Sequence, residues 1–127
     1  MDTPISQDNI LAAFQEYGQP QEKWLIGGEY ERIIVHKNGA PISYDEPYGI
    51  KWFLQQFQKR WDWSAHYENN KLIALQKDGA SITLEPGGQF ELSGRPHKTL
   101  KSLAEEFEEN RNCIRLLTEE SNRTAIT

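Results

Sequence analysis

The chain has 127 residues, which is the length of one domain or of a piece of a larger protein. Hydrophobic residues make up 37% of it and charged residues 26%, a composition typical of a globular protein and not of a disordered one. The net charge of -5 and the scattered basic residues argue against a nucleic-acid-binding surface.

The first ten residues, M-D-T-P-I-S-Q-D-N-I, lack the basic start and the apolar run of a signal peptide. No stretch approaches the ~18 apolar residues that a membrane span requires. From these two observations we expect a soluble cytoplasmic protein.

The residues that most often bind metals or react as nucleophiles are few. The three histidines, His36, His66 and His97, share no metal-ligand spacing, so a zinc site is not supported. The single cysteine, Cys113, falls within an amphipathic helical pattern, where a small buried hydrophobic residue is the commoner role. A reactive thiol is the alternative interpretation.

Two helices are predicted in the first half of the chain. Ser6 or Asp8 can cap the first, which Gly18 and Pro20 end, and its apolar residues are Ile10, Leu11, Phe14 and Tyr17. The second runs from Ile50 to Trp61 at helical spacing. We interpret its aromatic residues as core. The alternative is a stacking platform for a sugar or a base, built from Trp52, Trp61 and Trp63.

A third helix is predicted after Thr99, which can act as its N-cap. We expect five apolar residues to point inward: Leu100, Leu103, Phe107, Ile114 and Leu117. We expect four acids to point into solvent: Glu105, Glu106, Glu108 and Glu109. The segment that follows, S-N-R-T-A-I-T, has no pattern and is interpreted as a tail.

The predicted strands form an antiparallel sheet. A long strand is expected from Trp24 to His36, followed by a tight turn and by a loop from Pro41 to Pro47 that has room for a short strand. Three further strands are separated by the turns Asn69-Asn70 and Asp78-Gly79, and they cover Ala65 to Glu68, Lys71 to Gln76 and Ser81 to Glu85.

The stretch from Gly79 to Gly94 is the strongest hairpin signal, because two alternating runs flank the turn Pro86-Gly87-Gly88. The simplest register places Glu85 opposite Gln89, Leu84 opposite Phe90 and Thr83 opposite Glu91. One face, Ile82, Leu84, Phe90 and Leu92, is then core. The other face is polar, and its alternation does not decide between ordinary solvated sheet and the wall of a polar site.

Acids recur at spacings suited to a cation. Glu29 and Glu31 share one strand face, with every second residue ~6.6–6.8 Å further along the strand. Such a pair can bind one cation or two neighbouring ones; an exposed acidic edge beside Gly27-Gly28 is the equally weighted alternative. In the hairpin, Glu85 and Glu91 repel each other unless a positive charge lies between them.

Two stretches carry the motifs of a known family. I-G-G-E-Y-E-R, Ile26 to Arg32, looks like the I-G-x-E-x-E segment of the plant-type glutamate–cysteine ligases, or γ-glutamylcysteine synthetases. The segment from Leu72 to Pro96 contains E-P-G-G-Q-F-E-L-S-G and resembles their E-P-G-G-Q-x-E-L-S-G region. With W-D-W and the last helix also in matching places, the resemblance covers most of the chain.

This resemblance implies an α+β fold, in which an antiparallel sheet with flanking helices forms a glutamine-synthetase-like catalytic domain. The family joins the γ-carboxylate of glutamate to the amine of cysteine and hydrolyses ATP, the co-substrate, through a γ-glutamyl phosphate. Position by position, it implies Mg²⁺ binding by Glu29, Glu31, Glu85 and Glu91. Gln89, Gly87 and Gly88 match the part that borders the substrate. No catalytic residue is assigned.

The chain departs from the family in length and in a few residues. Tyr30, Arg32 and Ile33 occupy positions where we expect other residues in many members, and Arg95 lies in a short variable segment. Because members are several times longer, we interpret residues 1–127 as the truncated N-terminal part of the catalytic domain, inactive without the remainder of the ligase chain. The alternatives are a glutamate ligase that uses another amine and a catalytically empty binding or interaction domain.

Overall fold

The computed structural model describes residues 5–127 and has the α+β fold that the sequence predicts. The described part of the chain contains three α-helices, one short 3₁₀ helix and six strands. In chain order they are α1 (Gln7–Tyr17), the 3₁₀ helix η1 (Gln21–Lys23), β1 (Glu29–His36), α2 (Ile50–Trp61), β2 (Ser64–Glu68), β3 (Lys71–Lys77), β4 (Ala80–Glu85), β5 (Gln89–Ser93), α3 (Leu100–Ser121) and β6 (Arg123–Ile126).

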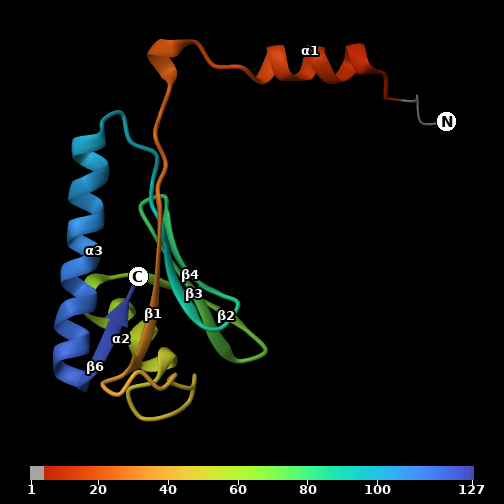
Figure 1. The fold of residues 1–127 in the computed structure, drawn as a ribbon. Coiled ribbons are helices and arrows are strands. Elements are labelled where there is room, and N and C mark those ends of the chain that lie inside the picture. The colour runs from red at the N-terminus through yellow and green to blue at the C-terminus, as the bar shows by residue number, and fades with distance from the viewer. Residues whose placement is uncertain (1–4) are drawn as a thin grey trace.

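The six strands form one antiparallel sheet in the order β2-β3-β4-β5-β1-β6. β2 to β5 follow one another as the predicted meander, and the predicted hairpin register of β4 and β5 is confirmed at Thr83↔Glu91, Leu84↔Phe90 and Glu85↔Gln89. β1 comes first in the chain but lies between β5 and β6 (Figure 1). The sheet therefore brings the two motif segments side by side.

The core lies between one face of the sheet and the helices α2 and α3. Phe53 and Phe57 of α2 and Leu117 of α3 are almost fully buried, against Ile82 and Leu92 of the hairpin. Full burial of one such side chain contributes about 1.5–3 kcal/mol. The predicted core face of the hairpin is confirmed, and the helices leave the opposite, polar face of the sheet uncovered.

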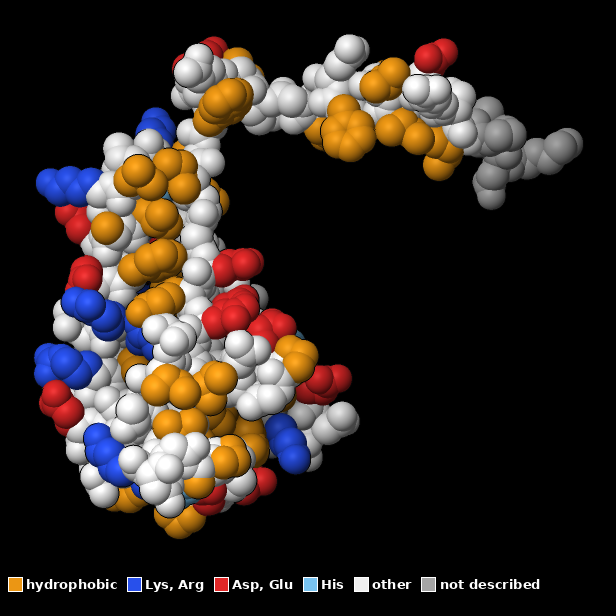
Figure 2. Space-filling view, in the orientation of Figure 1, with side chains coloured by type: hydrophobic (Ala, Val, Ile, Leu, Met, Phe, Trp, Pro, Cys, Tyr) orange, Lys and Arg blue, Asp and Glu red, His pale blue; other side chains and the backbone are white. Residues whose placement is uncertain are grey.

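Helix α1 forms as predicted but packs against nothing in the described chain. Ser6 caps it in a capping box with Asn9, and the Gly18 N–H closes its end by donating to the Phe14 carbonyl. Phe14 and Tyr17 are 76% and 79% exposed. Figure 1 shows α1 at the end of an extended segment, and Figure 2 shows its hydrophobic side chains along one side, with no other part of the protein against them.

Two strand predictions are wrong in extent. The strand expected from Trp24 begins only at Glu29, because Trp24 ends the 3₁₀ helix and Ile26 makes a single isolated bridge to His97. The short strand considered in the loop from Pro41 to Pro47 does not form. Pro41 makes only an isolated bridge, since proline has no N–H to donate to a sheet.

Predictions around α3 are also wrong in part. The segment after it is not an unpatterned tail, because Asn122 takes a left-handed conformation that ends α3 and β6 then pairs with β1. Leu100 was expected inward but is 69% exposed. Glu106 was expected outward, but its side chain is 12% exposed and turned toward His97. None of the described helices has the length and apolar character needed to cross a membrane.

Candidate active site

The polar face of the sheet collects acidic side chains from three neighbouring strands. Directly opposed residues of antiparallel strands point to the same face. One row of side chains therefore crosses β1, β5 and β4 and consists of Glu31, Glu91 and Thr83. The next row consists of Glu29, Ser93 and Ser81 on the same three strands. The structure brings the predicted acids of both motifs to one face, which α2 and α3 do not cover.

Glu31 and Glu91 are directly opposite each other on β1 and β5. Glu91 is only 7% exposed, and its Oε1 accepts a hydrogen bond of 3.0 Å from the Ser93 hydroxyl. Glu31 accepts one of 2.9 Å from the Gln89 side-chain amide. Neither carboxylate forms a salt bridge with a described residue. Two like charges thus lie opposite each other, an arrangement that costs stability unless a cation joins them.

The other two predicted metal ligands lie at different distances from this pair. Glu29 is two residues before Glu31 on the same strand face, about 6.6–6.8 Å away along the strand. Glu85 lies opposite Gln89 on β4, with β5 between it and Glu31, so two strand spacings, about 9.5 Å, separate their strands. Glu29, Glu31 and Glu91 are neighbours; Glu85 is more distant.

The donor set fits Mg²⁺. In this conformation no three His, Cys, Asp or Glu side chains of residues 5–127 are grouped closely enough to hold a metal ion. Mg²⁺ does not need such a group, because it usually binds one or two carboxylates and completes its octahedron with water and substrate phosphates. The opposed carboxylates of Glu31 and Glu91 supply hard oxygen ligands of that kind.

The residues predicted to border the substrate lie at the β4–β5 turn. Gly87 and Gly88 have φ values of +83° and +79°, which side chains other than glycine rarely adopt. Nothing within 4 Å would meet a Cβ at either position, so the tip of the turn is open. Gln89 connects this turn to the acid pair through its hydrogen bond to Glu31.

Gly28, beside the acids, is required by packing rather than by a ligand. A Cβ at Gly28 would lie 2.6 Å from Cζ of Phe107 on α3, whereas one at Gly27 would meet nothing within 4 Å. The Gly28 carbonyl also accepts a 2.8 Å hydrogen bond from the Gly94 N–H, which joins the two motif segments. The sequence pattern gave no signal of this contact, because Phe107 is remote in the chain.

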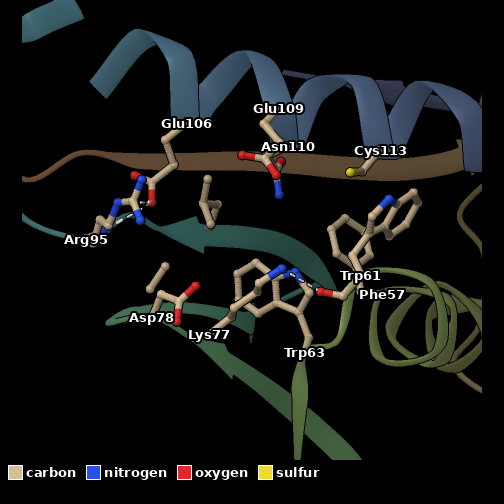
Figure 3. A pocket seen from close by; sticks show the side chains of 12 residues that line it. Phe57, Trp61, Trp63, Lys77, Asp78, Arg95, Glu106, Glu109, Asn110 and Cys113 are labelled. Atoms are coloured by element: carbon tan, nitrogen blue, oxygen red, sulfur yellow. Dashed lines mark hydrogen bonds and ion pairs between the residues drawn. The ribbon is translucent and has the colours of Figure 1, made fainter. Parts of the chain in front are cut away.

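A separate cavity of about 170 Å³ lies between α3 and the opposite face of the sheet (Figure 3). Glu109 and Asn110 point into it from α3, and Lys77 crosses its floor to donate a 2.7 Å hydrogen bond to the Trp61 carbonyl. Burial, with a smaller effect of the Glu109 charge, raises the pKa of the Cys113 thiol to about 11. Cys113 is therefore a neutral, buried thiol, as the structural interpretation expects.

The tryptophans of the predicted stacking platform pack toward the core. The rings of Trp61 and Trp63 lie 5.0 and 6.0 Å from that of Phe57, and Trp52 lies 5.2 Å from Phe53. All three are half-buried against the hydrophobic cluster, which agrees with the core interpretation.

An antiparallel sheet that is covered by helices on one face and carries opposed carboxylates on the other defines an α+β protein with an acidic sheet face. A sequence model of glutamate-cysteine ligase family 2 matches residues 25–121. The chain therefore belongs to this family.

Plant enzymes of the family are clearly similar to the chain. It is 35% identical over 121 residues to glutamate–cysteine ligase B, chloroplastic, of Oryza sativa subsp. japonica. The matched region covers 94% of this chain and 24% of the relative. It is 34% identical over 118 residues to the chloroplastic enzyme of Brassica juncea, with 92% and 22% covered. The Arabidopsis thaliana enzyme is 32% identical over the same shares. The chain spans about a quarter of the length of these relatives.

The relatives contradict the expected cytoplasmic location, because all three are described as chloroplastic. The expectation was drawn from the absence of a signal peptide and of a membrane span, and neither absence determines the compartment of a protein.

Proposed function

We propose that this chain forms part of the active site of an ATP-dependent ligase that joins the γ-carboxylate of L-glutamate to the amine of L-cysteine. The product is γ-glutamylcysteine, formed in the first step of glutathione biosynthesis through a γ-glutamyl phosphate. The observation that carries the proposal is the direct opposition of Glu31 and Glu91 on the open sheet face of a chain that belongs to glutamate-cysteine ligase family 2.

In this proposal the acids of the polar face hold Mg²⁺ and, with it, the phosphates of ATP. Glu31 and Glu91 are the central ligands, while Glu29 and Glu85 extend the site along β1 and onto β4. The bound cation supplies charge neutralisation for phosphoryl transfer. The hydrogen bonds from Gln89 and Ser93 hold one oxygen of each central carboxylate and leave the other for the ion.

The open turn is proposed as the border of the substrate. Without a Cβ, Gly87 and Gly88 allow close approach of a ligand to their backbone. The described rows of this face contain no Lys or Arg to bind the negatively charged phosphates and the substrate carboxylate. We infer that the remainder of the ligase chain supplies these cations, and that residues 1–127 are inactive alone.

Mg²⁺-dependent ATP binding tests the metal site directly. Isothermal titration of ATP into the 127-residue chain is expected to show a Mg²⁺-dependent part of the binding, which EDTA removes. Glu31→Gln and Glu91→Gln should each abolish the Mg²⁺-dependent part, while the matched control Glu105→Gln, an exposed acid on α3, should not. Unchanged binding in both variants would favour the catalytically empty binding domain.

Product formation tests the activity. The 127-residue chain, incubated with ATP, glutamate and cysteine, is expected to release no ADP beyond the background and no γ-glutamylcysteine by mass spectrometry. Formation of the dipeptide would overturn the inference that the chain is inactive alone. In the chain joined to the remaining ligase segments, competition between cysteine and other amines would identify the acceptor.

A further inference from the structure

A second charged cavity lies on the helix-covered side of the sheet, between β1, β6 and the C-terminal half of α3. Its volume is about 500 Å³. Its lining contains one acidic side chain, Glu119, and five basic ones: Arg32, Lys37, Arg111, Arg115 and Arg123. Figure 2 shows Lys and Arg side chains spaced along α3. We refer to this feature as the basic cavity.

Arg32 forms the buried wall of the basic cavity and has no acceptor there. Only 4% of the residue is exposed, and neither Nη1 nor Nη2 makes a hydrogen bond to a described residue. Its guanidinium lies 4.1 Å from the centre of the Tyr30 ring. A cation–π contact contributes about 0.5–2 kcal/mol, whereas burial of a cation without a hydrogen-bonded partner costs several kcal/mol. The Arg32 guanidinium is therefore a buried cation whose Nη atoms lack an acceptor in the described chain.

The basic cavity has more positive charges than carboxylate partners. Three of the arginines already reach a carboxylate: Arg111 pairs with Glu108, Arg115 with Glu119 and Arg123 with Glu46. Arg32 and Lys37 form no salt bridge with any residue of the described chain. Nε of Arg123 is likewise buried without an acceptor. Two positive charges without a carboxylate partner therefore remain, one buried at Arg32 and one exposed at Lys37, and a group of charge −2 would balance them.

We propose that the basic cavity binds a phosphate group, either as inorganic phosphate or as a phosphate monoester. Guanidinium groups match phosphate oxygens with two parallel hydrogen bonds, and phosphate carries close to two negative charges at pH 7. Arg111 and Arg115 line the cavity with 61% and 57% of their side chains exposed, whereas Arg32 is a buried lining residue. The Nη atoms of Arg32 are covered in this conformation, and binding requires a local rearrangement that uncovers them.

This site is distinct from the proposed active site. Arg32 follows Glu31 in β1, and successive side chains of a strand point to opposite faces of the sheet. Phosphates held through Mg²⁺ on the acidic face cannot reach the basic cavity through the sheet. The proposal therefore goes beyond the ligase reaction and gives the chain a second, metal-independent phosphate site.

The test uses the 127-residue chain in EDTA, so that Mg²⁺-dependent binding to the acids makes no contribution. Inorganic phosphate and, separately, AMP are titrated at constant ionic strength, with chloride as the reference anion. We expect saturable binding of at least one probe. Arg111→Gln and Arg115→Gln should each weaken it about tenfold, the scale of one charge-assisted hydrogen bond. Lys101→Gln, which removes an 87% exposed cation at the other end of α3, should not.

Arg32→Met distinguishes a phosphate-binding arginine from one that only supports the fold, and the readout is the unfolding temperature with and without phosphate. Methionine is similar in length and uncharged, so in phosphate-free buffer the variant should unfold at a higher temperature than the original chain. It should also lose the rise in unfolding temperature that phosphate causes. Glu31→Gln should keep that rise, which separates this proposal from the ligase site. Absence of binding beyond chloride, or binding unaffected by Arg32→Met, would overturn the proposal.

Discussion

Glu31 of β1 and Glu91 of β5 face each other directly across two antiparallel strands. At such positions the Cβ atoms lie about 4.5–5.5 Å apart, so the two carboxylates repel each other. Each accepts a hydrogen bond from a neutral side chain, and neither pairs with a described cation. The proposed cation site therefore costs the protein some stability while no cation is bound.

The cost of this pair is measurable. In EDTA, Glu91→Gln should raise the free energy of unfolding by about 0.2–1 kcal/mol, because it removes the repulsion and keeps an oxygen for the Ser93 hydroxyl. In Mg²⁺ the original chain should gain stability by ligand binding, and the variant should not. Thermal unfolding followed by circular dichroism, with Glu105→Gln as the control, checks both effects. Destabilisation in EDTA would contradict the repulsion.

The contact of Gly28 with Phe107 predicts a steric penalty. Gly28→Ala places a methyl group 2.6 Å from the Phe107 ring and should lower stability by about 1–3 kcal/mol. Gly27→Ala is the matched control, since its Cβ meets nothing within 4 Å. Urea unfolding gives the free energy of unfolding of both variants. The same measurement on Gly28→Ala combined with Phe107→Leu shows whether the smaller side chain at position 107 relieves the penalty. Equal effects at the two glycines would show that the packing is different from the one described.

The isolation of α1 predicts a strong contrast between two phenylalanines. Phe57→Ala should cost about 3–5 kcal/mol, because the side chain is buried between α2 and the hairpin. Phe14→Ala, at a position 76% exposed on α1, should change the free energy of unfolding by less than about 0.5 kcal/mol. If Phe14→Ala is as costly as a core substitution, α1 packs in solution, and the concentration dependence of the unfolding temperature would show whether a second copy is involved.

The raised pKa of Cys113 predicts an alkaline loss of stability. The thiol ionises near 9.0 in an unfolded chain and at about 11 in the folded one, where burial disfavours the thiolate. Below pH 9 this contribution to stability is fully present. Between about pH 9 and 11 the unfolded state releases its proton and the folded state does not, so stability falls as pH rises.

Between pH 8 and 11 the unfolding temperature should therefore fall less steeply with pH for Cys113→Ala than for the original chain. The slopes are compared rather than the absolute stabilities, because the substitution also removes buried volume. Alkylation by iodoacetamide at pH 8 should be slow in the folded chain and fast in urea. Fast alkylation of the folded chain would favour the reactive thiol.

Sequence periodicity was sufficient for most of the secondary structure. Ser6, Gly18 and Thr99 mark the helix ends where caps were expected, and the glycine-containing turn set the register of β4 and β5 correctly. The predictions failed where a segment remote in the chain determines the local structure. β6 has too few residues for a pattern and exists because it pairs with β1, and Glu106 turns inward because His97 lies there.

The sequence by itself determined the α+β class, the two acidic motifs and the family resemblance, because these depend on local spacing and residue type. Only the tertiary structure decided which residues of different strands meet. The insertion of β1 between β5 and β6 places Glu31 opposite Glu91 on one face and buries Arg32 on the other. No local pattern contains that information, because strand order is fixed by which pairing of the strands buries the shared apolar face against α2 and α3.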